Sequence, residues 1–134
     1  MFDELEKYKD NGHFFYESGT NILKISQNLP NKPGLFYILR LAYGKIDLVF
    51  VGISDSTKIN DKPQQQSLRA ILSNRKKGIR FQDYLERIIE KENIDALDIY
   101  WFVTEDDDPS DVANEILQNY YDFQGALPAW NKSF

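Results

Sequence analysis

Two strand-like apolar runs joined by a short turn fill the segment from Lys32 to Ser54. The first run is Leu35–Leu41 and the second is Ile46–Val51. The turn between them begins at Tyr43-Gly44-Lys45. Two such runs separated by a short glycine-containing turn are typical of a β-hairpin. We therefore predict a hairpin here, around which the other elements have to pack.

Helical patterns lie on both sides of this hairpin. Apolar residues recur at three- to four-residue spacing, which is typical of amphipathic helices. The last helix is the best marked, because Asp108 fits a helix cap, Pro109 the first helical position and Gly125 the end. The expected helices are residues 2–9, 67–73, 81–92 and 109–123.

The segment Ala96–Thr104 is rich in β-formers and predicts a buried strand. His13–Tyr16 fits a further short strand, and the polar stretch Ser54–Gln66 is expected to be a loop. Together these elements predict an α/β (α+β) fold, with a small three-stranded, mainly antiparallel sheet flanked by helices. We expect a single domain, in which residues 1–32 form an N-terminal helical extension and residues 33–131 form the core.

Composition limits the chemistry that this chain can perform. The sequence has no cysteine, which excludes disulfides, thiol nucleophiles and thiolate metal sites. It has no apolar run long enough to span a membrane, and its charged N-terminus is unlike a signal peptide, so we expect a cytoplasmic protein. The only histidine, His13, is expected to be structural or exposed, and the acidic run Glu105–Asp108 to be a solvated loop with a helix cap.

Charge is unevenly distributed along the chain. The net charge is −5. The segment Leu68–Lys91 nevertheless carries seven basic and three acidic residues, a local charge of +4. Such a region is either a phosphate-facing side or a solvated helical face. Its basic residues are Arg69, Arg75, Lys76, Lys77, Arg80, Arg87 and Lys91.

Three short motifs accompany the hairpin. Gly34-Leu35-Phe36 lies on the first strand, and Phe50-Val51-Gly52 lies on the second. Pro128-Ala129-Trp130-Asn131 comes near the end of the chain. With the order of elements, these motifs resemble the GIY-YIG nuclease superfamily, from about Pro33 to Asn131.

The resemblance implies a divalent-metal-dependent endonuclease that hydrolyses phosphodiesters. In the family a tyrosine helps to activate water, an arginine balances phosphate charge, a glutamate holds Mg²⁺ or Mn²⁺, and an asparagine orders the site. This chain has Phe36 and Phe50 at the two tyrosine positions, Ile71 at the arginine position and Ala113 at the glutamate position. Asn131 alone matches the pattern.

Two interpretations follow from these departures. In the first, the active site is impaired and the protein binds nucleic acid, DNA in preference to RNA, or a protein partner. The residues expected to bind nucleic acid are Arg69, Arg75, Lys76, Lys77 and Arg80. In the second, the protein is an active endonuclease whose residues have shifted, with Tyr37 and Arg75 as substitutes and Glu115 as the metal ligand.

Overall fold

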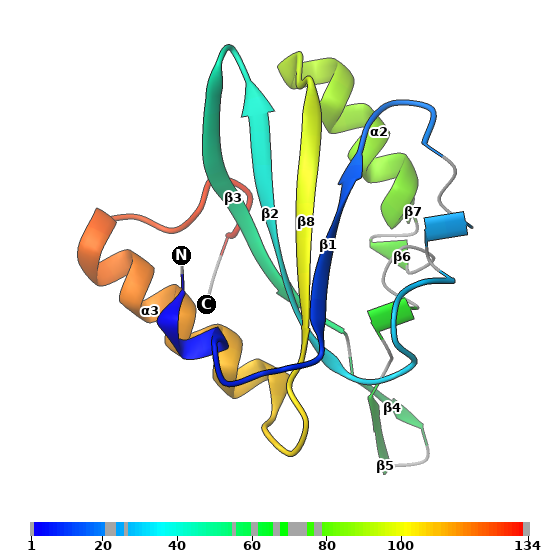
Figure 1. The fold of residues 1–134 in the computed structure, drawn as a ribbon, viewed down its shortest axis with the longest axis vertical. Coiled ribbons are helices and arrows are strands. Elements are labelled where there is room, and N and C mark those ends of the chain that lie inside the picture. The colour runs from blue at the N-terminus through cyan, green and yellow to red at the C-terminus, as the bar shows by residue number, and fades with distance from the viewer. Residues whose placement is uncertain are drawn as a thin grey trace.

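The computed structural model describes residues 2–20, 24–25, 27–54, 56–59, 62–65, 68–69, 75–76 and 79–132. Its centre is an antiparallel sheet of four strands in the order β1-β8-β2-β3 (Figure 1). The strands are β1 (Asn11–Tyr16), β2 (Gly34–Ala42), β3 (Lys45–Ile53) and β8 (Ala96–Val103). The α+β class and the antiparallel sheet are confirmed.

The expectation of three strands is wrong, because β1 joins the sheet as a fourth. β1 pairs with β8 along its whole length, from Asn11 opposite Phe102 to Tyr16 opposite Leu97. This strand lies within the N-terminal extension, residues 1–32, and contains the short strand predicted over His13–Tyr16, which we did not expect to join the sheet. Tyr16 is fully buried in the core beneath the sheet, and that burial fixes the position of the strand.

The predicted hairpin is confirmed, and both of its strands are longer than the apolar runs. Tyr43 and Gly44 form its turn with φ angles of 53° and 71°, the left-handed pair that matches the twist of two-residue hairpins. A bulge interrupts the pairing between Ile38 and Leu39. Val49 is the extra residue of the bulge, since Phe50 pairs with Ile38 and Leu48 pairs with Leu39.

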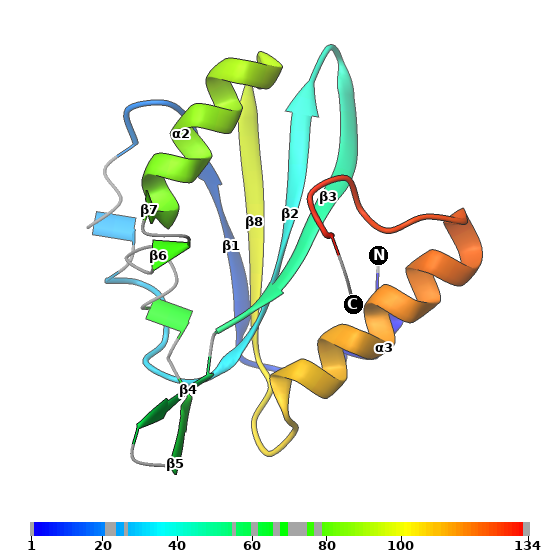
Figure 2. The same cartoon turned by 180° about the vertical axis from the view of Figure 1, so that it is seen from behind.

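Two helices cover the sheet, one on each face (Figures 1 and 2). They are α2 (Phe81–Glu92) and α3 (Pro109–Gln124), close to the predicted bounds. The side chain of Asp108 caps α3 by accepting from the Ser110 amide at 2.8 Å, and Gly125 ends it with a φ of 78°. Among the described residues, no helix is long and apolar enough to cross a membrane.

Each helix closes its own hydrophobic core. The α2-side core contains Phe36, Ile38, Leu85, Ile89 and Ile99. The α3-side core contains Leu35, Tyr37, Val51, Ala113 and Ile116. Successive residues of β2 thus enter opposite cores, as strand geometry requires.

The N-terminal segment does not form the expected helix over residues 2–9. It forms only a 3₁₀ turn, Asp3–Leu5. Leu5 and Tyr8 are both buried in the α3-side core, and the Tyr8 hydroxyl donates to Asp107 at 2.6 Å. These tertiary contacts outweigh the helical spacing of a short segment, which has little helical stability of its own.

Two small hairpins lie between β3 and α2. β4 (Ser56–Ile59) pairs with β5 (Lys62–Gln65), so the segment that we expected to be a loop contains strands. β6 (Arg75–Lys76) pairs with β7 (Ile79–Arg80) around the predicted basic turn. Of the helix expected over residues 67–73, only residues 68–69 are among those described.

The chain end closes the outer edge of β3. The Trp130 amide donates to the carbonyl of Val49, the bulge residue, at 2.8 Å. The Asn131 side chain makes two bonds to Val51, accepting from its N–H and donating to its C=O, each at 2.9 Å. A side-chain amide thereby replaces a neighbouring strand at this edge.

We predict that Asn131→Ala destabilises the protein, because it leaves the N–H and C=O of Val51 without partners. The free energy of unfolding should fall by about 1–3 kcal/mol in denaturant titrations. Asn114→Ala removes an exposed asparagine from α3 and is the matched control, expected to stay within about 0.5 kcal/mol. Equal stabilities for the two variants would contradict the role of Asn131.

Candidate functional site

The two positions that correspond to the family's tyrosines lie together on the α2 side of the sheet. The rings of Phe36 and Phe50 are 5.8 Å apart between centroids and tilted by 44°. Phe36 is only 4% exposed and belongs to the α2-side core. A phenyl ring neither accepts nor releases a proton, so these two side chains supply no acid or base.

Gly52 makes this packing possible. A Cβ at Gly52 would lie 2.6 Å from Cζ of Phe36 and 2.6 Å from Cε2 of Phe50. Phe36 is also the register partner of Gly52 on the neighbouring strand. The two rings therefore lie over the bare backbone of the glycine, where any larger residue would displace them.

The positions that correspond to the metal-binding glutamate lie on the other side of the sheet. Ala113 is buried in the α3-side core, and Glu115 is exposed on α3. An ion held by Glu115 would be separated by the sheet from any phosphate placed at Phe36 and Phe50. Among the described residues, no group of three or more His, Asp or Glu side chains is arranged to hold a metal ion. The side chains at the described family-equivalent positions, Phe36, Phe50 and Ala113, carry no oxygen that could bind the family's Mg²⁺ or Mn²⁺.

Tyr37, the substitute for Phe36, also lies in the α3-side core. Its ring stacks on Tyr100 at 4.9 Å and meets the ring of Phe2 edge-on at 5.2 Å. Burial, followed by interactions with Tyr100 and Asp98, raises the pKa of Tyr37 to about 12. Its hydroxyl thus keeps its proton near neutral pH and is not poised to act as a base.

The expected nucleic-acid-binding residues belong to the α2 side where the structure describes them. Arg69 is exposed and donates from Nε to the carbonyl of Leu29 at 3.0 Å. Arg75, Lys76 and Arg80 lie on the β6–β7 hairpin beside α2 (Figure 2). Ile71 and Lys77 lie outside the described residues. Arg75 and Glu115 thus come from elements on opposite sides of the sheet.

One residue cluster was not expected from the sequence. Nδ1 of His13 is 2.9 Å from Oδ1 of Asp98, which is buried on β8. The imidazole also stacks on Tyr100 at 4.7 Å, almost parallel at 10°. His13, Tyr100 and Tyr37 are directly opposite one another on β1, β8 and β2, so their rings form a row across the sheet. The sequence pattern alone does not indicate this row, because it depends on the pairing of β1 with β8.

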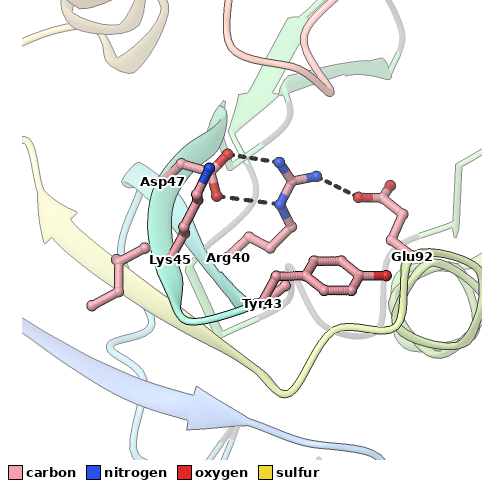
Figure 3. A pocket seen from close by; sticks show the side chains of 7 residues that line it. Arg40, Tyr43, Lys45, Asp47 and Glu92 are labelled. Atoms are coloured by element: carbon pink, nitrogen blue, oxygen red, sulfur yellow. Dashed lines mark hydrogen bonds and ion pairs between the residues drawn. The ribbon is translucent and has the colours of Figure 1, made fainter.

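The hairpin tip borders a hollow of about 820 Å³ (Figure 3). Two cations, Arg40 and Lys45, line it. Arg40 donates to Asp47 from Nε and Nη2 at 3.2 and 2.6 Å, and from Nη1 to Glu92 at 2.5 Å. Glu92 also accepts from the indole of Trp130 at 3.2 Å. Since two carboxylates already neutralise Arg40, this arginine joins the hairpin, α2 and the chain end rather than holding a phosphate.

No protein-family model matches this sequence, and the comparisons with curated proteins and with solved structures find no match either. The resemblance to GIY-YIG nucleases therefore depends on the motifs and on the order of the elements.

We predict that Gly52→Ala destabilises the protein by about 1–3 kcal/mol, because the new methyl group overlaps both phenyl rings. The same substitution in a Phe36→Leu background should be less destabilising, since the smaller side chain leaves space. A double-mutant cycle of unfolding free energies measures this coupling. Additive effects of the two substitutions would show that Phe36 does not pack on Gly52.

Proposed function

We propose that this protein is a nucleic-acid-binding domain that resembles GIY-YIG nucleases but does not hydrolyse phosphodiesters. The proposal has two parts, the loss of catalysis and the location of the binding side. The phenyl rings and the separation of the family-equivalent positions by the sheet support the first part.

The location of the binding side is supported by the uneven distribution of charge between the two faces of the sheet. No lysine or arginine occurs between Lys91 and Lys132, a stretch that includes all of α3. The same stretch holds the acidic loop Glu105–Asp108 and the α3 residues Asp111, Glu115 and Asp122. The α3 side is thus unsuited to a polyanion, because phosphate contacts require cations.

The α2 side carries the basic residues that the α3 stretch lacks, together with the acidic residues of α2 itself. Arg69, Arg87 and Lys91 are exposed there. The β6–β7 register places Arg75 directly opposite Arg80. This register brings two basic residues to one position of the hairpin, which supports contact with phosphate groups. DNA is the expected ligand in preference to RNA, with a protein partner as the other outcome.

We predict that Arg75→Glu/Arg80→Glu weakens the binding of labelled DNA by about tenfold or more at low salt, measured by fluorescence anisotropy. The slope of log K against log salt should become shallower by about two. Single- and double-stranded DNA and RNA are compared in the same series.

The matched control is Lys45→Glu/Lys132→Glu. Both of these lysines are exposed and lie outside the basic segment, and the change in net charge is the same. This control should keep the affinity within about threefold, allowing for long-range charge effects. Equal losses in the two variants would contradict a binding side at β6–β7. Failure of the unaltered protein to bind any nucleic acid would favour a protein partner instead.

A further inference from the structure

The two outer edges of the sheet differ in the hydrogen bonding of their backbone groups. The β3 edge is closed by Trp130 and Asn131. The β1 edge lies at the other end of the strand order (Figure 1). In the described part of the chain, no backbone hydrogen bond is made to the outer edge of β1. Its amides and carbonyls are spaced to pair with another extended strand.

The sequence of β1 lacks the features that keep edge strands from pairing. Natural edges are commonly protected by charged residues or proline. β1 reads Asn-Gly-His-Phe-Phe-Tyr and contains neither. Phe15 is 52% exposed and His13 is exposed beside it. A neutral edge with an exposed aromatic ring favours association with a second strand.

The row of rings across the sheet ends at this same edge. Tyr37 stacks on Tyr100, and Tyr100 stacks on His13. Asp98 holds the imidazole in place at 2.9 Å. His13 is thus a fixed planar group at the outermost strand position, where a ring directly opposite would extend the row.

We propose that the outer edge of β1 pairs antiparallel with β1 of a second copy of this chain, with His13 opposite the partner's His13. This register also places Asn11 opposite the partner's Phe15, which removes the exposed phenyl ring from water.

Charge complementarity selects this register. Antiparallel pairing centred on His13 brings Lys9 opposite the partner's Glu17, and symmetry repeats the pair at the other end. Lys9 and Glu17 are both exposed. If Phe14 were opposite the partner's Phe14 instead, Lys9 would face a glycine and Glu17 an asparagine. Of these two registers, only the one centred on His13 forms two ion pairs. A register centred on Gly12 would place Glu17 opposite the partner's Lys7, which already pairs with Asp107 at 3.4 Å.

The dimer that follows has a continuous eight-stranded sheet, since each copy contributes four strands. The two-fold axis is perpendicular to the sheet, so both α3 helices lie on one face and both α2 helices on the other. A single strand pair with few side chains is a small interface, and each copy carries a charge of −5. We therefore expect a weak dimer, with a Kd on the order of micromolar or higher.

Sedimentation equilibrium of the full chain over about two decades of concentration tests this dimer. Lys9→Glu should raise the Kd by about five- to tenfold, because it places like charges opposite each other at both ends. Glu17→Lys should do the same. The combined variant Lys9→Glu/Glu17→Lys restores opposite charges and should return the Kd to within about twofold of the original. Lys45→Glu, at the hairpin tip, is the control and should have no effect.

The absence of cysteine allows a second test by cross-linking. Residues directly opposite on paired strands lie about 4.5–5.5 Å apart between Cα atoms, within disulfide range. His13→Cys should therefore form an intermolecular disulfide under mild oxidation. Phe15→Cys should not, since the two positions lie about 13 Å apart in this register. Circular dichroism confirms that both variants are folded.

Three results would overturn the proposal. One is a monomer at every concentration together with no cross-link in the His13→Cys chain. Another is a dimer whose Kd is not restored by the combined charge exchange. The third is equally rapid cross-linking of the His13→Cys and Phe15→Cys chains, which would indicate random collision or another register.

Discussion

The central strand β2 is the constraint on which the rest of the structure depends. It is hydrogen-bonded to β3 on one edge and to β8 on the other, and helices cover both of its faces. A strand in this position has no side that faces water, so nearly all of its residues have to be apolar. Phe36 enters one core and Tyr37 the other. Phe36 has no hydroxyl, and burial raises the pKa of the Tyr37 hydroxyl, so neither side chain offers a titrating group to a substrate.

Because of this burial, positions that the resemblance assigns to chemistry serve packing in this fold. The hairpin, the neighbouring strand, α3 and Asn131 follow one another in the order that the resemblance to GIY-YIG nucleases implies. Asn131 serves the edge of β3, where both of its amide atoms bond to Val51. The two phenyl rings fill the space above Gly52. The positions to which the resemblance assigns chemistry therefore serve packing and edge pairing in this structure.

The sequence predicted the elements whose signals are local. Residues 81–92 have helical periodicity, the helix from residue 109 has caps as well, and the Tyr43-Gly44 turn sets the hairpin. It did not predict features that depend on distant contacts. The helix expected over residues 2–9 gave way to the burial of Leu5 and Tyr8. The strand predicted over His13–Tyr16 is present, but its place in the sheet depends on pairing with β8. The His13–Asp98 pair joins residues 85 positions apart, so no local pattern indicates it.

The central claim is that the protein holds nucleic acid without cutting it. The most direct test is a single-turnover cleavage assay, with protein in excess over end-labelled DNA at a concentration where anisotropy shows the DNA to be bound. Reactions contain Mg²⁺, Mn²⁺ or chelator. Our account predicts intact DNA in all three. Cleavage that requires the metal and disappears in Glu115→Ala would contradict it, and would show an active endonuclease with shifted residues.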